Sequence, residues 1–423
     1  KIMDTISPLD NRYSKKIEDV TLLFSDYRWN QYKYALELEY LHFFVQKTQN
    51  KTLSIKSIYD RELYNKICEE EKKTNHDIQA LINVLKTQIP QEYAQWVHFG
   101  LTSQDINSPA MVMVYKEYIN SIFLPELYRF QEKLNEKINK YGELEILSFT
   151  HGQPATSIKV HNIFDVYISK LKNIRNDLFD YKWATKVGGS SGNLTSLFFV
   201  FPDIDWEKEM DNFVKNLGIE RNKHTTQIDD YSHYFKLFQI FERLCYLLIN
   251  ICQDIWHYCS KKYFFLKNVE NEVGSSAMPH KINPIQFENA EGNLKLAATI
   301  FHTVGSNIML CRLQRDLTDS TLLRNVGVAF GHLTLSLRNM ISGIDRIEID
   351  SAVIKQDLDN NNCIKMEYIQ LLFRKWNIQE GYNICKEYIR GKNSFETADF
   401  INYLTDTKNI ILNSEQINFI LRI

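Results

Sequence analysis

The sequence lacks the features that mark several large classes of protein. Its formal net charge is −2, from 50 Lys and Arg against 52 Asp and Glu, so no overall basic field draws it to nucleic acid or to an anionic membrane. No apolar run approaches the roughly 18 residues that a membrane-spanning helix needs, and the N-terminal segment lacks the apolar stretch of a signal peptide. We therefore expect a cytoplasmic protein that binds neither nucleic acid nor membrane.

Cysteine usage also excludes a metal or disulfide framework. The seven cysteines are an odd number and include no CxxC pair, which is typical of reduced thiols in a cytosol-like compartment. Cys245, Cys252 and Cys259 recur every seven residues and so share one helical stripe, where small buried core residues are the ordinary interpretation. We expect no metal site.

Proline is scarce, and its scarcity allows long helices. Only eight prolines occur, and none lies in residues 203–278 or 285–423. Between Asp229 and Phe264, apolar residues recur at helical spacing over far more than an average helix length. Short strands are expected only at 198–201 and 347–349. The pattern predicts an all-α fold, with further long helices at 109–140, 157–186, 288–311 and 317–342.

Polar chemistry collects in four segments between these helices: 98–108, 148–156, 186–193 and 274–284. In the last of them, Gly and paired Ser precede two prolines, while Lys281 and Asn283 offer a cation and an amide suited to a carboxylate. An isolated Gly-Ser-Ser is more often an ordinary solvated loop. The whole eleven-residue string favours a movable loop that carries a reactive hydroxyl.

This string resembles the signature of the fumarase/aspartase superfamily, whose members release fumarate or a related product by β-elimination. His151, within residues 150–156, resembles the second conserved region of that superfamily, and residues 102–107 resemble the first. The resemblance covers most of the chain. It implies a homotetramer with a 20-helix core and four composite sites, each assembled from three subunits, and no cofactor.

The same resemblance implies three mostly helical domains. Their expected boundaries are residues 1–108 for an N-terminal domain, 109–342 for the central long-helix bundle and 343–423 for a C-terminal domain. Independently of the resemblance, helices this long overhang a single-chain core and are expected to bury the surplus against neighbouring subunits.

The leaving group is suggested by residues 315–324. Arg315, Ser320 and Arg324 surround an expected helix start, and guanidinium groups with free backbone N–H groups suit a phosphate. A surface salt-bridge cluster is the alternative for this segment alone. In context the segment resembles the nucleotide-phosphate segment of the adenylosuccinate lyase family.

Further segments resemble the longer bacterial-type members of that family: residues 7–14, 73–77 and 225–228. The resemblance implies that Arg12 and Tyr13 hold the phosphate end and that Gln227 contacts a substrate carboxylate. It also implies that Asn75, His76 and Asp77 line the purine side of the site. The remaining residues that it places around the substrate are Thr102, Ser103 and Thr150.

The expected substrate is adenylosuccinate, giving AMP and fumarate, or its imidazole-carboxamide precursor SAICAR, giving AICAR and fumarate. Proton loss next to a carboxylate builds negative charge there, which Lys281 and Asn283 are suited to stabilise. The family mechanism makes Ser275 the general base and His151 the general acid. His151 has the natural pKa for an acid near neutrality.

Three other functions are alternatives to a nucleotide-cleaving lyase. The serine loop is shared by argininosuccinate lyase, fumarase, aspartase and the cycloisomerases. These enzymes bind no nucleotide, so phosphate-binding residues would have no ligand in them. A helical scaffold that has lost activity disagrees with the intact Ser275, His151, Lys281 and Asn283. A nucleic-acid-binding helical protein predicts a basic stripe that is missing here. The discriminating phosphate set is Arg12, Tyr13, Arg315, Ser320 and Arg324.

Overall fold

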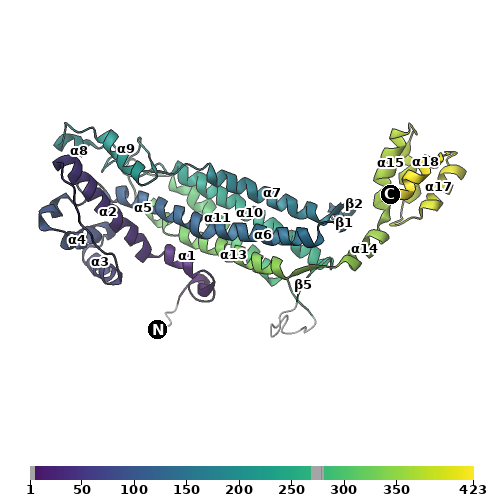
Figure 1. Ribbon diagram of the computed structural model, residues 1–423, viewed down its shortest axis with the longest axis horizontal. Helices are drawn as coiled ribbons and strands as arrows, with labels where there is room; N and C mark the ends of the chain where they lie inside the picture. Colours follow the sequence, from purple (N-terminus) through teal and green to yellow (C-terminus); the bar gives the residue numbers. More distant parts are fainter. Residues whose placement is uncertain (1–4, 268–277, 279–280) are drawn as a thin grey trace. The chain divides into compact units, whose positions relative to one another are not determined.

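A computed structural model describes residues 5–267, 278 and 281–423 of the chain (Figure 1). Its residues group into two compact units, each assembled from several segments. The first unit comprises Lys1–Phe130, Lys170–Gln253 and Ile285–Ser342, and the second comprises Gln131–Ser169, Asp254–Pro284 and Gly343–Ile423. No helix in the described ranges is long and apolar enough to cross a membrane. The expected three-domain division stays a prediction.

The first unit begins with four α-helices, of which the last three share an apolar core. Ser25 caps the longest of them by accepting a hydrogen bond from the Arg28 backbone N–H at 3.2 Å. Tyr34, Leu81 and Leu85 are almost completely buried where these helices meet. The helices are α1 (Glu18–Leu23), α2 (Asp26–Gln49), α3 (Arg61–Thr74) and α4 (Asp77–Gln88).

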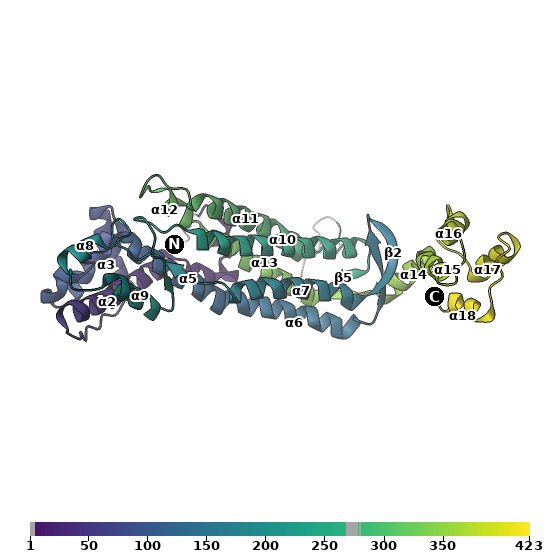
Figure 2. The same cartoon turned by 90° about the horizontal axis from the view of Figure 1, so that it is seen from above.

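Long helices then form a bundle, and Figures 1 and 2 both show α10, α11 and α13 side by side. Phe241, Phe301 and Phe330 join these helices, with ring centroids 5.0–5.5 Å apart. The structure thus confirms the long helices that the spacing predicted, except the single helix expected at 317–342. They are α5 (Ser103–Tyr118), a π-helical turn (Ile119–Phe123), α6 (Leu124–Tyr141), α7 (Val160–Phe179), α10 (Ser232–Ser260), α11 (Ile285–Ile308) and α13 (Val326–Arg346).

Two local predictions for the first unit were wrong. The apolar run 198–201 lies largely in helix α8 (Thr195–Val200) rather than in a strand, because the Phe198 N–H bonds to the Leu194 carbonyl. Short apolar runs do not separate strand from helix. The helix expected at 317–342 is divided into α12 (Thr318–Leu323) and α13. β3 (Ala184–Thr185) precedes α8, and α9 (Trp206–Asn216) and β4 (Glu220–Arg221) lie between α8 and α10. β3 and β4 pair in parallel.

The second unit contains two short antiparallel pairs and a helical C-terminal part. β1 (Glu145–Thr150) pairs with β2 (Gln153–Lys159), and β5 (Phe264–Leu266) pairs with β6 (Ile347–Ile349), which confirms the strand expected at 347–349. Phe373 and Phe400 are fully buried in the C-terminal core. Its helices are α14 (Ser351–Asn360), α15 (Met366–Lys375), α16 (Gly381–Ile389), α17 (Thr397–Asp406) and α18 (Ser414–Arg422).

Candidate active site

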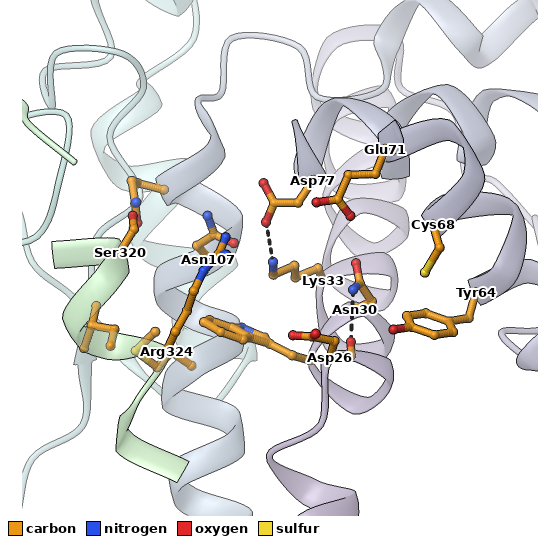
Figure 3. A pocket seen from close by; sticks show the side chains of 14 residues that line it. Asp26, Asn30, Lys33, Tyr64, Cys68, Glu71, Asp77, Asn107, Ser320 and Arg324 are labelled. Atoms are coloured by element: carbon orange, nitrogen blue, oxygen red, sulfur yellow. Dashed lines mark hydrogen bonds and ion pairs between the residues drawn. The ribbon is translucent and has the colours of Figure 1, made fainter. Parts of the chain in front are cut away.

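A pocket of about 190 Å³ lies in the first unit among α2, α3, α5 and α12 (Figure 3). Three residues predicted to contact the substrate line it: Asp77, Ser320 and Arg324. Figure 3 shows Ser320 and Arg324 on one side and Tyr64 on the opposite side. The pocket therefore joins the predicted phosphate end with the predicted purine end of the site.

A lysine that the sequence analysis did not single out pairs with Asp77 in this pocket. The Lys33 Nζ lies 2.8 Å from the Asp77 Oδ2, and the Lys33 side chain is only 6% exposed. Burial on its own would raise the pKa of Asp77, but the charge and hydrogen bond of Lys33 outweigh burial and lower that pKa. Asp77 is therefore held as a carboxylate, an acceptor for N–H donors of a ligand.

The position of Asp77 follows from the sharp turn between α3 and α4. Asn75 ends α3 in the left-handed conformation, with φ 50°, which asparagine tolerates better than most residues. His76 caps α4 by accepting a hydrogen bond from the Gln79 N–H through Nδ1 at 3.2 Å. Its Nε2 lies 3.5 Å from the Ser103 Oγ. The turn thus brings His76 to the predicted Thr102–Ser103 segment.

Ser320 and Arg324 reach the pocket from opposite ends of the short helix α12, where Arg324 is the residue after the last helical one. Arg315 does not line this pocket, because its guanidinium is paired with both carboxylate oxygens of buried Asp319 at 3.0 Å. The Tyr231 hydroxyl also donates to Asp319, at 2.6 Å. Arg315 therefore helps to fix α12, while Arg324 supplies the pocket's guanidinium.

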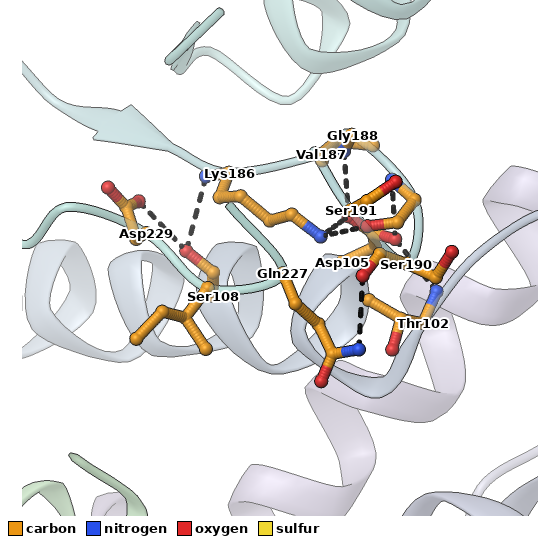
Figure 4. Close-up of polar contacts among 12 residues, drawn as sticks. Thr102, Asp105, Ser108, Lys186, Val187, Gly188, Ser190, Ser191, Gln227 and Asp229 are labelled. Carbon is orange, nitrogen blue, oxygen red and sulfur yellow. Dashed lines mark hydrogen bonds and ion pairs between the residues drawn. The ribbon is translucent and has the colours of Figure 1, made fainter. Parts of the chain in front are cut away.

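A second polar cluster surrounds the N-terminus of α5 (Figure 4). Asp105 pairs with Lys186 at 2.6 Å, and both side chains are fully buried. Burial lowers the pKa of Lys186, and the Asp105 carboxylate opposes that shift. The Gln227 side-chain amide donates to the Ser190 carbonyl at 3.0 Å. Predicted substrate-binding residues Thr102 and Gln227 thus bond into one cluster, because the Thr102 N–H donates to Asp105 at 2.8 Å, and Ser103 is the next residue along α5.

The N-terminal pair Arg12 and Tyr13 lies elsewhere in the first unit. The Arg12 guanidinium carbon is 5.8 Å from the centroid of the Tyr13 ring, and Arg12 is exposed. The Tyr13 hydroxyl accepts a hydrogen bond from the Asn289 side-chain amide at 3.1 Å. Neither residue lines the pocket of Figure 3, so their phosphate-binding role stays a prediction.

The predicted acid, His151, occupies the tip of the β1–β2 hairpin in the second unit. Thr150 pairs with Gln153, so His151 and Gly152 form a two-residue turn, with φ 54° and 73°. Positive φ at both positions is what a type I′ turn requires, and Asn-Gly is the favoured sequence there. Histidine in the left-handed region is uncommon. The turn leaves the His151 side chain exposed at the tip of the hairpin.

The signature loop is described only in part. Ser275, the predicted base, lies outside the described residues. Lys281 is exposed, and its backbone N–H bonds to the Met278 carbonyl at 3.1 Å. Asn283 is half-buried just before α11. Both residues belong to the second unit, as Thr150 and His151 do.

One group of side chains in the described part of the chain has ligand atoms close enough to hold a metal. The ligating atoms of Asp229, Asp230 and His233 lie within 4.8 Å of one another. Asp229 already accepts hydrogen bonds from the Ser108 hydroxyl at 3.3 Å and the Asn222 amide at 3.1 Å. The buried Asp229 carboxylate therefore connects α5 to the segment around Asn222, and we assign no metal to it.

Sequence reasoning missed Lys33 and Lys186. A lysine in the middle of a helix ordinarily lies on the solvated face, and nothing near Lys33 in the sequence indicates its burial. Lys186 opens the segment 186–193, which was recognised only as a polar loop. The one local sign of a buried Lys186 is the pair Gly188 and Gly189 two residues later, because glycines allow another part of the chain to approach the backbone closely.

Comparison with known proteins matches nearly the whole chain to one family. Residues 54–298 match the family model described as Lyase, and residues 311–418 match the model described as Adenylosuccinate lyase C-terminal. The adenylosuccinate lyase of Dictyostelium discoideum is 36% identical over 92% of this chain and 88% of its own length. That of Escherichia coli K12 is 31% identical over 92% of this chain and 89% of its own length.

Solved structures show the same fold. A fumarate lyase from Mesorhizobium sp. BNC1 has a TM-score of 0.76 at 14% identity, covering 95% of this chain and 93% of its own. A 3-carboxy-cis,cis-muconate lactonizing enzyme from Pseudomonas putida has a TM-score of 0.71 at 17% identity, covering 96% and 92%. At these identities the likeness concerns the fold alone.

Proposed function

Because this chain belongs to the adenylosuccinate lyase family, we propose that it cleaves adenylosuccinate to AMP and fumarate, and SAICAR to AICAR and fumarate. The observation that carries the proposal is the pocket in which Ser320 and Arg324 meet the Lys33–Asp77 pair. A guanidinium and a hydroxyl suit a phosphate, and a carboxylate suits the N–H groups of a base or carboxamide. A substrate without a nucleotide would leave these groups unused.

The proposed reaction is a β-elimination by general acid and base groups alone. Ser275 removes a proton from the carbon next to a substrate carboxylate, the carbon–nitrogen bond breaks, and a carbon–carbon double bond forms. His151 gives a proton to the departing nitrogen. Lys281 and Asn283 stabilise the charge that builds on the carboxylate. The exposed position of His151 at the tip of the β1–β2 hairpin supports this role, because a general acid must come within hydrogen-bond reach of the ligand.

We propose that the site is completed in a homotetramer with a 20-helix core and four composite sites. The pocket of about 190 Å³ is smaller than the roughly 300–1,000 Å³ of typical ligand sites, so a single chain encloses only part of a nucleotide. Large apolar side chains are also left on the surfaces of long helices, as expected of subunit contacts. They include Val166 (50% exposed), Tyr246 (55%) and Leu296 (52%).

We place the reaction in the cytoplasm. All seven cysteines are free thiols, and three of them, Cys245, Cys252 and Cys385, are buried. Burial raises the pKa of the Cys385 thiol to about 12, so it stays protonated and unreactive. Free thiols in this number are ordinary in a reducing compartment.

A direct assay tests the proposal. Purified protein is mixed with adenylosuccinate, and ultraviolet absorbance follows the formation of AMP while an independent assay measures fumarate. Argininosuccinate, and fumarate with ammonia, serve as alternative substrates. We expect turnover with adenylosuccinate and none with argininosuccinate or with fumarate and ammonia. Ser275→Ala should lose several orders of magnitude in turnover without loss of helical circular dichroism. Turnover of argininosuccinate alone, or no turnover by a folded tetramer, would reject the proposed function.

A further inference from the structure

The Asp105–Lys186 ion pair lies behind the predicted substrate-binding residues, not among them. Both side chains are fully buried, and the Lys186 Nζ is 2.6 Å from the Asp105 Oδ1 (Figure 4). Neither residue lines the pocket of Figure 3. A buried pair of this kind is weak evidence for stability, because well-packed apolar residues often serve as well. Its geometry indicates a different role.

The Asp105 carboxylate joins two distant segments through their backbones. One oxygen accepts from the Gly188 N–H at 2.7 Å, in addition to Lys186, and the other accepts from the Gly189 N–H at 3.1 Å and the Thr102 N–H at 2.8 Å. The Lys186 ammonium in turn donates to the Gly189 carbonyl at 2.7 Å. Loop 186–193 and the start of α5 are thus held to a single carboxylate.

The segment that carries Gln227 is attached to the same loop. Its side-chain amide donates to the Ser190 carbonyl at 3.0 Å. Gly192 has φ 85°, and a Cβ at this position would lie 2.2 Å from the Thr225 carbonyl oxygen, so only glycine allows this close approach. Ser108, one helical turn after Asp105, accepts from the Lys186 N–H at 3.3 Å and donates to Asp229 at 3.3 Å. Loop 186–193 and the segment that carries Gln227 are therefore in direct contact at two points.

We propose that Lys186 and Asp105 are positioning residues, which hold Thr102, Ser103 and Gln227 as one preformed surface of hydroxyl and amide groups against the substrate. The proposal rests on the proposed function, because that function makes these three residues substrate contacts. Hydroxyl and amide donors recognise an anionic oxygen, here a carboxylate of the succinyl group. The ion pair touches no reacting atom and acts by keeping the donors in place before the ligand arrives.

The test uses the wild-type protein and three variants. Lys186→Met removes the cation, and Lys186→Arg keeps it. Lys47→Met is the control, since Lys47 forms an ion pair with Glu209 at 2.7 Å outside this cluster. For each variant we would measure KM and kcat for adenylosuccinate, and hydrogen exchange of peptides that cover residues 186–193. If Lys186→Met does not fold, the double variant Lys186→Met/Asp105→Asn is used in its place. The double variant leaves no unpaired buried charge, because both charges of the ion pair are removed.

We expect Lys186→Met to lower kcat/KM about 100-fold, as small misplacements of binding groups do, and to speed exchange in 186–193 at least about tenfold. Lys186→Arg should recover much of both, and Lys47→Met should match the wild type. Wild-type kinetics and exchange in Lys186→Met would overturn the proposal while leaving the proposed function intact. Faster exchange without a change in kcat/KM would limit the pair to loop stability and also overturn it. A wild type that does not cleave adenylosuccinate would instead reject the proposed function, whatever the exchange shows.

Discussion

The Lys33 ammonium lies 2.8 Å from the Asp77 carboxylate, although the two residues are 44 positions apart in the chain. Lys33 also lies over the Trp29 ring, 4.7 Å from its centroid. The pKa of Asp77 is below its ordinary value of 3.8 because the interaction with Lys33 outweighs the effect of burial. A depressed carboxyl pKa stabilises the fold above the ordinary pKa, and this stabilisation is lost as pH falls through the folded value.

We therefore predict that Lys33→Met lowers the free energy of unfolding at pH 7 by about 1–3 kcal/mol, because Asp77 is left half-buried without its cation. The measurement is urea unfolding followed by circular dichroism between pH 3 and 7. The double variant Lys33→Met/Asp77→Asn should recover part of the loss, since no uncompensated charge remains. Equal stability of Lys33→Met and wild type at pH 7 would show that the pair contributes nothing.

Substitutions of His151 can separate its effect on the stability of the hairpin from its effect on the reaction. Asparagine tolerates the left-handed conformation of the first hairpin position better than histidine, and it cannot donate a proton as an acid. We predict that His151→Asn keeps or raises the melting temperature, while turnover falls by about 100- to 10,000-fold, the usual contribution of a general acid.

His151→Ala is the companion variant, because alanine fits the turn less well. It should lose the same turnover and also melt earlier than His151→Asn. Turnover of His151→Asn within a few-fold of the wild type would remove His151 from the proposed mechanism, whatever its effect on stability.

The long helices could be predicted from the sequence because their cause is local. Apolar spacing and the lack of proline placed a helix within residues 229–264, and α10 spans Ser232–Ser260. The interruption between α12 and α13 could not be predicted in the same way. No proline or glycine lies at the break, where the Asn325 N–H bonds to the Leu322 carbonyl three residues back, while the Asn325 side-chain amide donates to the Thr321 carbonyl at 3.0 Å. A side chain that competes for a backbone carbonyl in this way does not show in the apolar spacing.

The residues of the candidate site also divide into those that the sequence could predict and those that it could not. Asp77, Ser320 and Arg324 were found through family resemblance, and the structure places them in one pocket. Lys33 and Lys186 could not be found, since each is identified by a carboxylate far away in the sequence. The His151 turn carried a readable signal: a polar residue before glycine, between two segments able to form strands.

Arg324 provides a test of phosphate recognition. A charge-assisted hydrogen bond contributes about 1.5–3 kcal/mol, so Arg324→Met should weaken inhibition by AMP roughly 10- to 150-fold. Binding of adenosine, which has no phosphate, should be unchanged. Arg312→Met is the control, because Arg312 is an exposed arginine paired with Asp316 outside the pocket. An equal loss for AMP and adenosine would place Arg324 against the base or ribose instead.

Glu348 connects three donors in the second unit. The Lys140 and Lys267 ammonium groups lie 2.6 Å from its two carboxylate oxygens, and the Tyr141 hydroxyl also donates to it. Burial on its own would raise the pKa of Glu348, but these hydrogen bonds lower it to about 2, from an ordinary value of 4.5. The stabilisation is therefore fully present above pH 4.5 and is lost as pH falls toward 2.

We predict that Glu348→Gln lowers the free energy of unfolding at neutral pH by about 1–3 kcal/mol, because a neutral amide replaces a carboxylate that accepts charged hydrogen bonds. The gap between variant and wild type should narrow steadily below pH 4.5, where the unfolded wild-type chain begins to take up the proton. Urea unfolding at half-unit steps from pH 3 to 7 measures this gap. Glu387→Gln, at an exposed pair with Lys408, should stay close to the wild type throughout. A gap for Glu348→Gln that is constant over this range would mean that packing of the side chain, and not its charge, stabilises β6.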